Sequence, residues 1–183
     1  MRGLDPLKIL NSQSGVTLLE LVVAIAVLGV LLGIAVPGFN QLLLNNRQVS
    51  ATNEFIAALQ GARSTAVTRN SRVTVCASQD QASCSGGNWS AGWIVFSDDN
   101  GNQSFDGGET LLRARDNIEQ INITSPDFGL ALTFAANGRA VAGSGQFMVC
   151  DSRGATHGKV IILSPSGRPR TSSTQNDGSA PAC

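Results

Sequence analysis

The chain has 183 residues, enough for one domain with a modest hydrophobic core, and its 13 Lys and Arg residues balance its 13 Asp and Glu residues. This balance excludes a protein whose overall charge would drive binding to polyanions. The charges are unevenly placed, however: residues 80–127 hold eight acidic residues and two arginines, whereas residues 128–176 hold five basic residues and one aspartate. A local binding partner is therefore compatible with the neutral total.

An apolar segment at residues 16–36 has the length and composition of a membrane-spanning helix. Its sequence, VTLLELVVAIAVLGVLLGIAV, carries one charge, Glu20, and a helix of this length rises about 30 Å, the thickness of a bilayer's hydrocarbon core. The leader, residues 1–15, contains two basic residues, which favours a cytoplasmic N-terminus. A secretory signal peptide has its small residue after the apolar run. Here Gly15 precedes the run, so cleavage after Gly15 leaves the helix on the mature protein.

Glu20 is the one charged side chain in the apolar segment, and two interpretations of it are open. A carboxylate near the end of a membrane span is costly and is a functional candidate by default; the alternative is an interfacial acid that reaches the lipid headgroups. A functional role is available because cleavage after Gly15 gives Val16 a free α-amino group. The amine of one subunit can pair with Glu20 of its neighbour and set their axial register, which removes most of the desolvation penalty of both charges.

The segment SGVTLLELVVAIAVLGVLLGIAVPGFNQL resembles the N-terminus of type IV pilins and type II secretion pseudopilins. Gly15 stands before the cleavage site, Glu20 is the fifth mature residue, and Pro37 is the 22nd. The resemblance implies cleavage and N-methylation of Val16 by a prepilin peptidase. It also implies a single-pass anchor in the inner membrane, with the remaining domain periplasmic or extracellular, followed by packing with other pilins in a pilus. Val16 replaces the Phe usual in the family, and processing is expected nonetheless.

Residues 37–70 are predicted to continue the helix as an amphipathic half, because apolar residues recur at helical spacing to about Thr68. Pro37 is expected to kink the helix or to melt it locally. Residues 71–183 are predicted to form a β-rich domain with antiparallel pairing, because Gly, Asn, Asp and Ser clusters separate short runs of strand-forming residues. Strands are expected at Arg72–Ala77, Gly92–Ser97, Thr110–Arg115, Ile118–Thr124, Ala131–Phe134, Gln146–Asp151 and Lys159–Ser164.

Two further signals concern turns and the tail. Asn137-Gly138 is a hairpin signal. The tail, residues 171–182, has a composition that is disordered on its own, and Cys183 is placed to tie it back to the sheet. The fold class is thus α+β, a long N-terminal helix packed on an antiparallel sheet domain, and the resemblance implies that it is a pilin fold.

The four cysteines suggest disulfides formed outside the cytosol, because their number is even and the chain carries an export segment. Proximity in the sequence favours two pairs, although four cysteines permit three pairings and all three stay open. The favoured pairs are Cys76 with Cys84 and Cys150 with Cys183.

Three segments of the globular part are informative: NEFIAALQGARSTAVTRNSRVTVCAS, GWIVFSDDNGNQSFDGGETLLR and FMVCDSRGATHGKVIILSPSGRPR, at residues 53–78, 92–113 and 147–170. With these segments the globular part resembles the GspH/FimT family of minor pilins and pseudopilins. The cysteine pairs and GWIVF are closer to the pilus-tip members of FimU and FimT type than to the secretion pseudopilin. The resemblance implies a minor pilin that helps to initiate or cap pilus assembly. Two alternatives are a DNA receptor for natural transformation and a type II secretion pseudopilin.

The motif Gly167-Arg168-Pro169-Arg170 is a candidate DNA-binding site. Pro169 favours an extended backbone, so Arg168 and Arg170 point to one side, where two guanidinium groups suit phosphate oxygens. The resemblance adds that FimT-type DNA receptors carry a GRxR motif, matched by Gly167, Arg168 and Arg170. Arg139, Arg153 and Lys159 are predicted to enlarge the patch if they fold nearby. Binding to double-stranded DNA would then be sequence-independent and salt-sensitive; the alternative is a solvated strand end, or pairing with acidic residues of neighbouring pilins.

The remaining candidates point away from catalysis. Asp98–Glu109 spaces its oxygen donors like an EF-hand loop, but Gln103 occupies the position of the expected glycine, so a loop capped by Asx turns is favoured over a calcium site. His157 is the only histidine and has no partner that would suggest a zinc or catalytic site. Trp89 and Trp93 are expected in the core. No enzyme activity, cofactor or metal is predicted.

Overall fold

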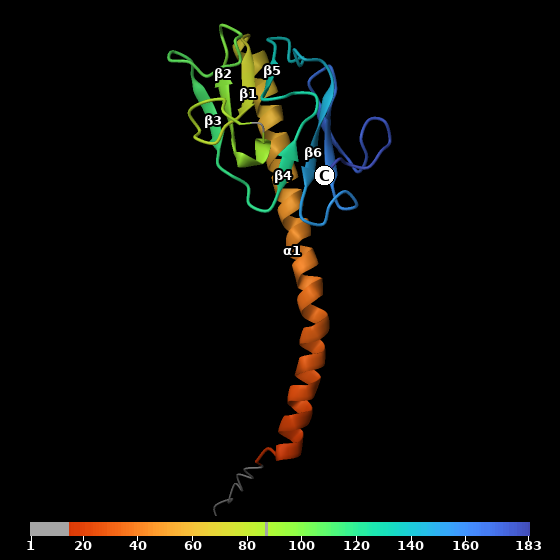
Figure 1. The fold of residues 1–183 in the computed structure, drawn as a ribbon. Coiled ribbons are helices and arrows are strands. Elements are labelled where there is room, and N and C mark those ends of the chain that lie inside the picture. Colours follow the sequence, from red (N-terminus) through yellow and green to blue (C-terminus); the bar gives the residue numbers. More distant parts are fainter. Residues whose placement is uncertain (1–14, 87) are drawn as a thin grey trace, which may run out of the picture. The chain divides into compact units, whose positions relative to one another are not determined.

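The computed structural model describes residues 15–86 and 88–183, and its one α-helix, α1, spans Leu18–Arg69 (Figure 1). The helix begins where the Thr17 hydroxyl oxygen accepts a hydrogen bond from the Glu20 backbone N–H at 3.2 Å, an N-cap that satisfies one of the free donors of the first turn. It ends at Asn70, whose φ of 50° is left-handed, while the Ser71 N–H donates to the Ala66 carbonyl at 3.2 Å. The sequence predicts a helix from residue 16 to about residue 68, so both ends lie within two residues of the prediction.

Pro37 lies inside α1 without interrupting it. Of the two outcomes expected at Pro37, local melting is therefore wrong, and a kink stays a prediction. A proline removes one hydrogen bond of the helical ladder, and a 52-residue helix has enough other turns to continue through it. Among the described residues, α1 alone is long and apolar enough to cross a membrane. The chain divides into two compact units after Leu42.

The unit Leu43–Cys183 contains two four-stranded antiparallel sheets, drawn on the C-terminal part of α1 in Figure 1. The first sheet has the order β3-β2-β1-β5 and the second the order β4-β6-β7-β8. A short 3-10 helix, Trp89–Ala91, precedes β2. The strands are β1 (Val73–Ala77), β2 (Trp93–Ser97), β3 (Leu111–Arg115), β4 (Asn122–Thr124), β5 (Ala131–Phe134), β6 (Gly145–Cys150), β7 (Lys159–Leu163) and β8 (Pro169–Ser172).

Seven strands lie where the sequence predicts them, with end points that differ by a few residues. The largest difference is at β4, which begins at Asn122 rather than Ile118; the Ile118 N–H donates instead to the Ser90 carbonyl. The eighth strand, β8, was not expected, because Thr171 and Ser172 were placed in the disordered tail. They pair with Ile161 and Val160 of β7, so the sheet edge orders them.

The core lies between α1 and the inner faces of the two sheets. Phe55 of α1 is fully buried and makes edge-on contacts with Trp89, Trp93 and Phe147, at ring centroid distances of 5.6, 5.0 and 4.9 Å. The core placement of both tryptophans is therefore confirmed. On α1, the residues that face this core recur at three- and four-residue spacing, as an amphipathic helix requires: Gln48, Ala51, Thr52, Phe55, Ala58, Leu59, Ala62 and Ala66.

Two disulfides fasten segments that lie outside the sheets. Cys76 of β1 is bonded to Cys84, and Cys150 of β6 is bonded to Cys183. This is the pairing that proximity in the sequence favoured. The second bond returns the tail to the sheet, where Pro181 is buried and the Gln146 side chain bonds to Gln175 and to the Asn176 N–H. The tail therefore has partners in the folded chain that its composition alone does not reveal.

Candidate functional site: an apolar helix and two arginine hairpins

The apolar part of α1 is exposed. Every residue from Gly15 to Leu43 is exposed, including Val16 at 72% and Leu31 at 58%. Contiguous exposed apolar surface of this extent requires an apolar environment, which is either a membrane or other helices. Glu20 is exposed in the first turn of α1, where a carboxylate also interacts favourably with the helix dipole. Gly15 and Val16 precede the first helical residue and are exposed.

A second feature is a pair of similar hairpin turns, each of which ends in Gly-Arg. In the turn between Ala135 and Arg139, the Gly138 N–H donates to the Ala135 carbonyl at 2.7 Å and the Ala135 N–H to the Arg139 carbonyl at 2.9 Å. In the β7–β8 turn, Gly167 donates to Ser164 at 2.8 Å and Ser164 to Arg168 at 3.1 Å. Both glycines have a φ of 75°, a conformation that glycine adopts without steric cost. The hairpin signal at Asn137-Gly138 is confirmed.

Arg63 of α1 joins these two turns. Its Nε–H donates to the Gly138 carbonyl oxygen at 3.0 Å and to the Ser166 carbonyl oxygen at 3.1 Å. The turns also touch each other, because a Cβ atom on Gly167 would collide with the Gly138 carbonyl oxygen. Gly138 and Gly167 are buried, whereas the arginines that follow them, Arg139 and Arg168, are exposed. The fold therefore places two exposed arginines next to two turn backbones that are in direct contact.

Arg170 extends this group along the edge strand β8, where it pairs with Ile162 and is exposed. Within the described residues, no ion pair involves Arg63, Arg139, Arg168 or Arg170. We call these four residues the arginine cluster. Such guanidinium groups are suited to the oxygens of a phosphate backbone.

Lys159 lies apart from the arginine cluster. It is the first residue of β7 and pairs with Val149 of β6, three residues before the Ile162–Arg170 pair. Three residues of strand span about 10 Å. Lys159 is half-buried and lines a groove with Val49 and Asn53 of α1 and with residues 171–173.

Arg153 does not join the cluster, and the expectation that it enlarges the basic patch is corrected. Its guanidinium is almost buried, with 8% of the side chain exposed, and Nη2 lies 2.6 Å from Asp151 Oδ2. Its Nε–H donates to both Asp151 oxygens, and its Nη1–H donates to Asn45 Oδ1 of α1 at 2.7 Å. The hydrogen bonds from Arg153 hold the pKa of Asp151 below its usual value, and the same bonds raise the pKa of Arg153. Arg153 is thus part of the domain's structure.

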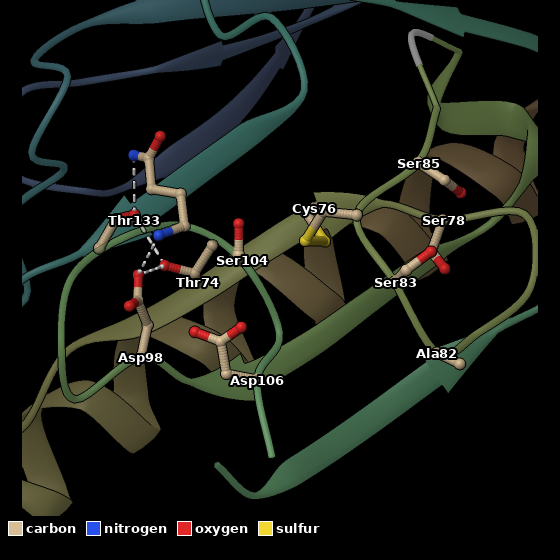
Figure 2. The surroundings of a disulfide bond; sticks show 12 residues. Thr74, Cys76, Ser78, Ala82, Ser83, Ser85, Asp98, Ser104, Asp106 and Thr133 are labelled. Carbon is tan, nitrogen blue, oxygen red and sulfur yellow. Dashed lines mark hydrogen bonds between the residues drawn. A yellow bond between two sulfur atoms is a disulfide. The ribbon is translucent and has the colours of Figure 1, made fainter. Parts of the chain in front are cut away.

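The loop Asp98–Glu109 forms the Asx turns expected of it. The Asn102 N–H donates to Asn100 Oδ1 and the Ser104 N–H to Asn102 Oδ1, at 2.9 and 2.8 Å. Asp98 is fully buried, and Figure 2 shows it beside Thr74 and Thr133. Its Oδ2 accepts from the Thr74 hydroxyl at 2.6 Å. Within the described part of the chain, no group of three or more His, Cys, Asp or Glu side chains is arranged to hold a metal ion.

His157 is exposed, and its Nδ1 lies 3.0 Å from the Thr156 hydroxyl.

Arg63 is the site residue that sequence reasoning missed. It lies 75 residues from Gly138 and 103 residues from Ser166, so nothing local signals the contact. The repeated Gly-Arg pairs at 138–139 and 167–168 were the available clue.

The comparisons with known proteins agree with this structure. Residues 51–167 match the family described as type II transport protein GspH, and residues 10–36 match the prokaryotic N-terminal methylation motif. A crystal structure of the type IV minor pilin FimU of Pseudomonas aeruginosa (strain PAO1) is similar, with a TM-score of 0.56 and 25% identity over 74% of this chain and 93% of that chain. A second crystal form of FimU gives a TM-score of 0.53 at the same identity, over 72% of this chain and 95% of that chain. No curated protein sequence matches significantly.

Proposed function

Because the chain belongs to the GspH family and carries the N-terminal methylation motif, we propose that it is a minor pilin of a type IV pilus that helps to initiate or cap pilus assembly. One observation carries the proposal: residues 15–43 are exposed and almost entirely apolar. The similar crystal structure of a type IV minor pilin favours a pilus over a secretion filament. Cleavage after Gly15 by a prepilin peptidase and N-methylation of Val16 belong to the same proposal.

Glu20 sets the register of packing in this proposal. The Val16 amine of one subunit pairs with the Glu20 carboxylate of its neighbour inside an apolar helix bundle, where an unpaired charge would be expensive. The helix is first held in the inner membrane, and the globular unit Leu43–Cys183 stands on the periplasmic side. The helix then passes from lipid to the filament without exposure to water, so other pilins are its partners.

The test is to follow the protein into filaments in a strain that makes type IV pili. We expect Glu20→Ala to remove it from the sheared pilus fraction while the membrane fraction retains it, because the substitution removes the paired carboxylate and leaves the anchor apolar. Glu119→Ala, which removes an exposed carboxylate of the globular unit, serves as the control and should enter filaments normally. Wild-type amounts of the Glu20→Ala protein in sheared pili would contradict the role of Glu20. Co-purification with a secretion filament instead would identify a pseudopilin.

A second candidate function is favoured by the arginine cluster: the protein binds double-stranded DNA as a receptor for natural transformation. Four arginines without an ion-pair partner among the described residues gather around two turns. Such a surface contacts phosphates and does not read bases, since aromatic residues for stacking are few in this chain.

The salt dependence of DNA binding is the slope of log K against the logarithm of the salt concentration. We expect the double variant Arg168→Ala/Arg170→Ala to reduce the size of this slope by about 2, because each lost phosphate contact reduces it by about 0.9. The measurement is fluorescence anisotropy of a random-sequence duplex with the full chain in a nonionic detergent. Arg113→Ala, which removes an exposed arginine that lies 3.9 Å from Glu54, should leave the slope unchanged. An unchanged slope in the double variant would show that these arginines do not contact DNA.

A further inference from the structure

We propose that Arg63 is a positioning residue that locks the two Gly-Arg turns together, so that Arg139 contacts the same DNA duplex as Arg168 and Arg170. This inference rests on the DNA-binding function proposed above and adds to it a second turn and the residue that places it. The site is then bipartite, built from residues 135–139 and 164–170 and not from the Gly167–Arg170 motif alone.

One donor of Arg63 reaches both turns. The Arg63 Nε–H is shared between the Gly138 and Ser166 carbonyl oxygens, at 3.0 and 3.1 Å. These oxygens belong to turns at the ends of different sheets, because the first turn follows β5 and the second connects β7 to β8. A charged donor strengthens a hydrogen bond to a carbonyl roughly twofold over a neutral one. Arg63 therefore connects the ends of both sheets to α1.

The two turns are in direct contact. A Cβ atom on Gly167 would collide with the Gly138 carbonyl oxygen, and a Cβ atom on Gly138 would meet Val67 Cγ2 of α1 at 2.8 Å. The two glycines are needed both for their φ of 75° and for this close approach. Because the backbones touch at these glycines, a shift of one turn moves the other. Arg139 and Arg168 follow directly, so their relative positions are fixed by the same contact.

Arg63 is half-buried and keeps its Nε on the two carbonyls, while Arg139, Arg168 and Arg170 are exposed. Three exposed guanidinium groups on a fixed backbone match a rigid row of phosphates better than groups on turns that move independently, because less conformational freedom is lost on binding. Loss of Arg63 should therefore weaken DNA binding by more than the loss of one positive charge would. In particular, it should remove the contribution of Arg139 to binding.

The experiment is a double-mutant cycle on the full chain in nonionic detergent, with a random-sequence duplex and a series of salt concentrations. In the wild-type background, Arg139→Ala should reduce the salt slope by about 0.9. In the Arg63→Met background the same change should have no further effect, because the turn that carries Arg139 no longer has a fixed position. Arg69→Met is the matched control: it removes one exposed arginine from the same helix, and Arg139→Ala should keep its full effect in that background.

Hydrogen exchange of the turn amides decides the coupling without DNA. The Ala135, Gly138, Ser164 and Gly167 amides, all hydrogen-bonded within the turns, should exchange faster in Arg63→Met and at the wild-type rate in Arg69→Met. Unchanged exchange, or an effect of Arg139→Ala that is the same in all three backgrounds, would overturn the positioning role. If the wild-type protein fails to bind DNA at low salt, the DNA-binding function itself is wrong, and the exchange data alone then decide whether Arg63 couples the turns.

Discussion

Phe55→Ala is expected to lower the free energy of unfolding of the unit Leu43–Cys183 by about 4 kcal/mol, the usual cost of deleting a fully buried aromatic ring. Phe55 has no exposed surface, and three other aromatic rings meet its edge or face. These rings come from the 3-10 helix, β2 and β6, so the cavity would open where α1 meets both sheets. Because domains of this size are stable by about 5–15 kcal/mol, the loss takes a large share of the total.

The measurement is urea unfolding of this unit with its disulfides intact, followed by the fluorescence of Trp89 and Trp93, both of which touch Phe55. Val67→Ala is the matched control, because Val67 lies on the same helix with 49% of its surface exposed, and its loss should be within about 1 kcal/mol. A loss below about 1 kcal/mol for Phe55→Ala would mean that α1 does not hold the two sheets together as the structure indicates.

The sequence predicts the elements of this fold well where the signal is local. The apolar run at residues 16–36 and the Asn137-Gly138 turn are each specified by a few neighbouring residues, and the structure has both. The disulfide Cys150–Cys183 also follows from proximity, although the ordering of the tail by β7 does not.

The candidate site was predicted less completely, because its contacts are distant in the sequence. Arg168 and Arg170 were found from their own spacing. Arg63 reaches across 75 and 103 residues, and no periodicity of α1 distinguishes it from a solvated arginine. Arg153 was misjudged for the opposite reason: a basic residue in a Gly-rich turn is typical of an exposed surface, yet Asp151, two residues earlier, and Asn45 of α1 enclose it. Counting the charged residues of a sequence does not tell which of them are buried, and burial decides whether an arginine is available to a ligand.

Asp151→Asn is the second change for which we expect a large effect, a loss of about 3 kcal/mol in the free energy of unfolding at neutral pH. The Asp151 side chain has no exposed surface and accepts three hydrogen bonds from the Arg153 side chain and one from its backbone N–H. The amide that replaces it cannot neutralise the guanidinium, which stays almost buried beside Asn45. An uncompensated buried charge is more expensive than a lost pair on the surface.

The pH dependence of this loss distinguishes the charge from the shape of the side chain. The hydrogen bonds from Arg153 lower the pKa of Asp151 in the folded protein, so the folded state holds the proton less tightly than the unfolded chain, where the pKa is about 3.9. The stability that the pair contributes is therefore fully present above about pH 4 and is lost as the pH falls through the lower folded pKa. The difference between wild type and Asp151→Asn should thus be constant near neutral pH and shrink in acid.

Urea unfolding from pH 7 to pH 3 measures this difference. Asp177→Asn is the control: Asp177 is exposed, and its pKa is lowered by hydrogen bonds from the Ser179 hydroxyl and N–H. Because water replaces those bonds easily at an exposed position, Asp177→Asn should change the free energy of unfolding at neutral pH much less than Asp151→Asn does. If the loss from Asp151→Asn were the same at pH 3 as at pH 7, packing rather than charge would explain it. Arg153 would then be held by its neighbours without the carboxylate, and its exclusion from the basic patch would no longer rest on the ion pair.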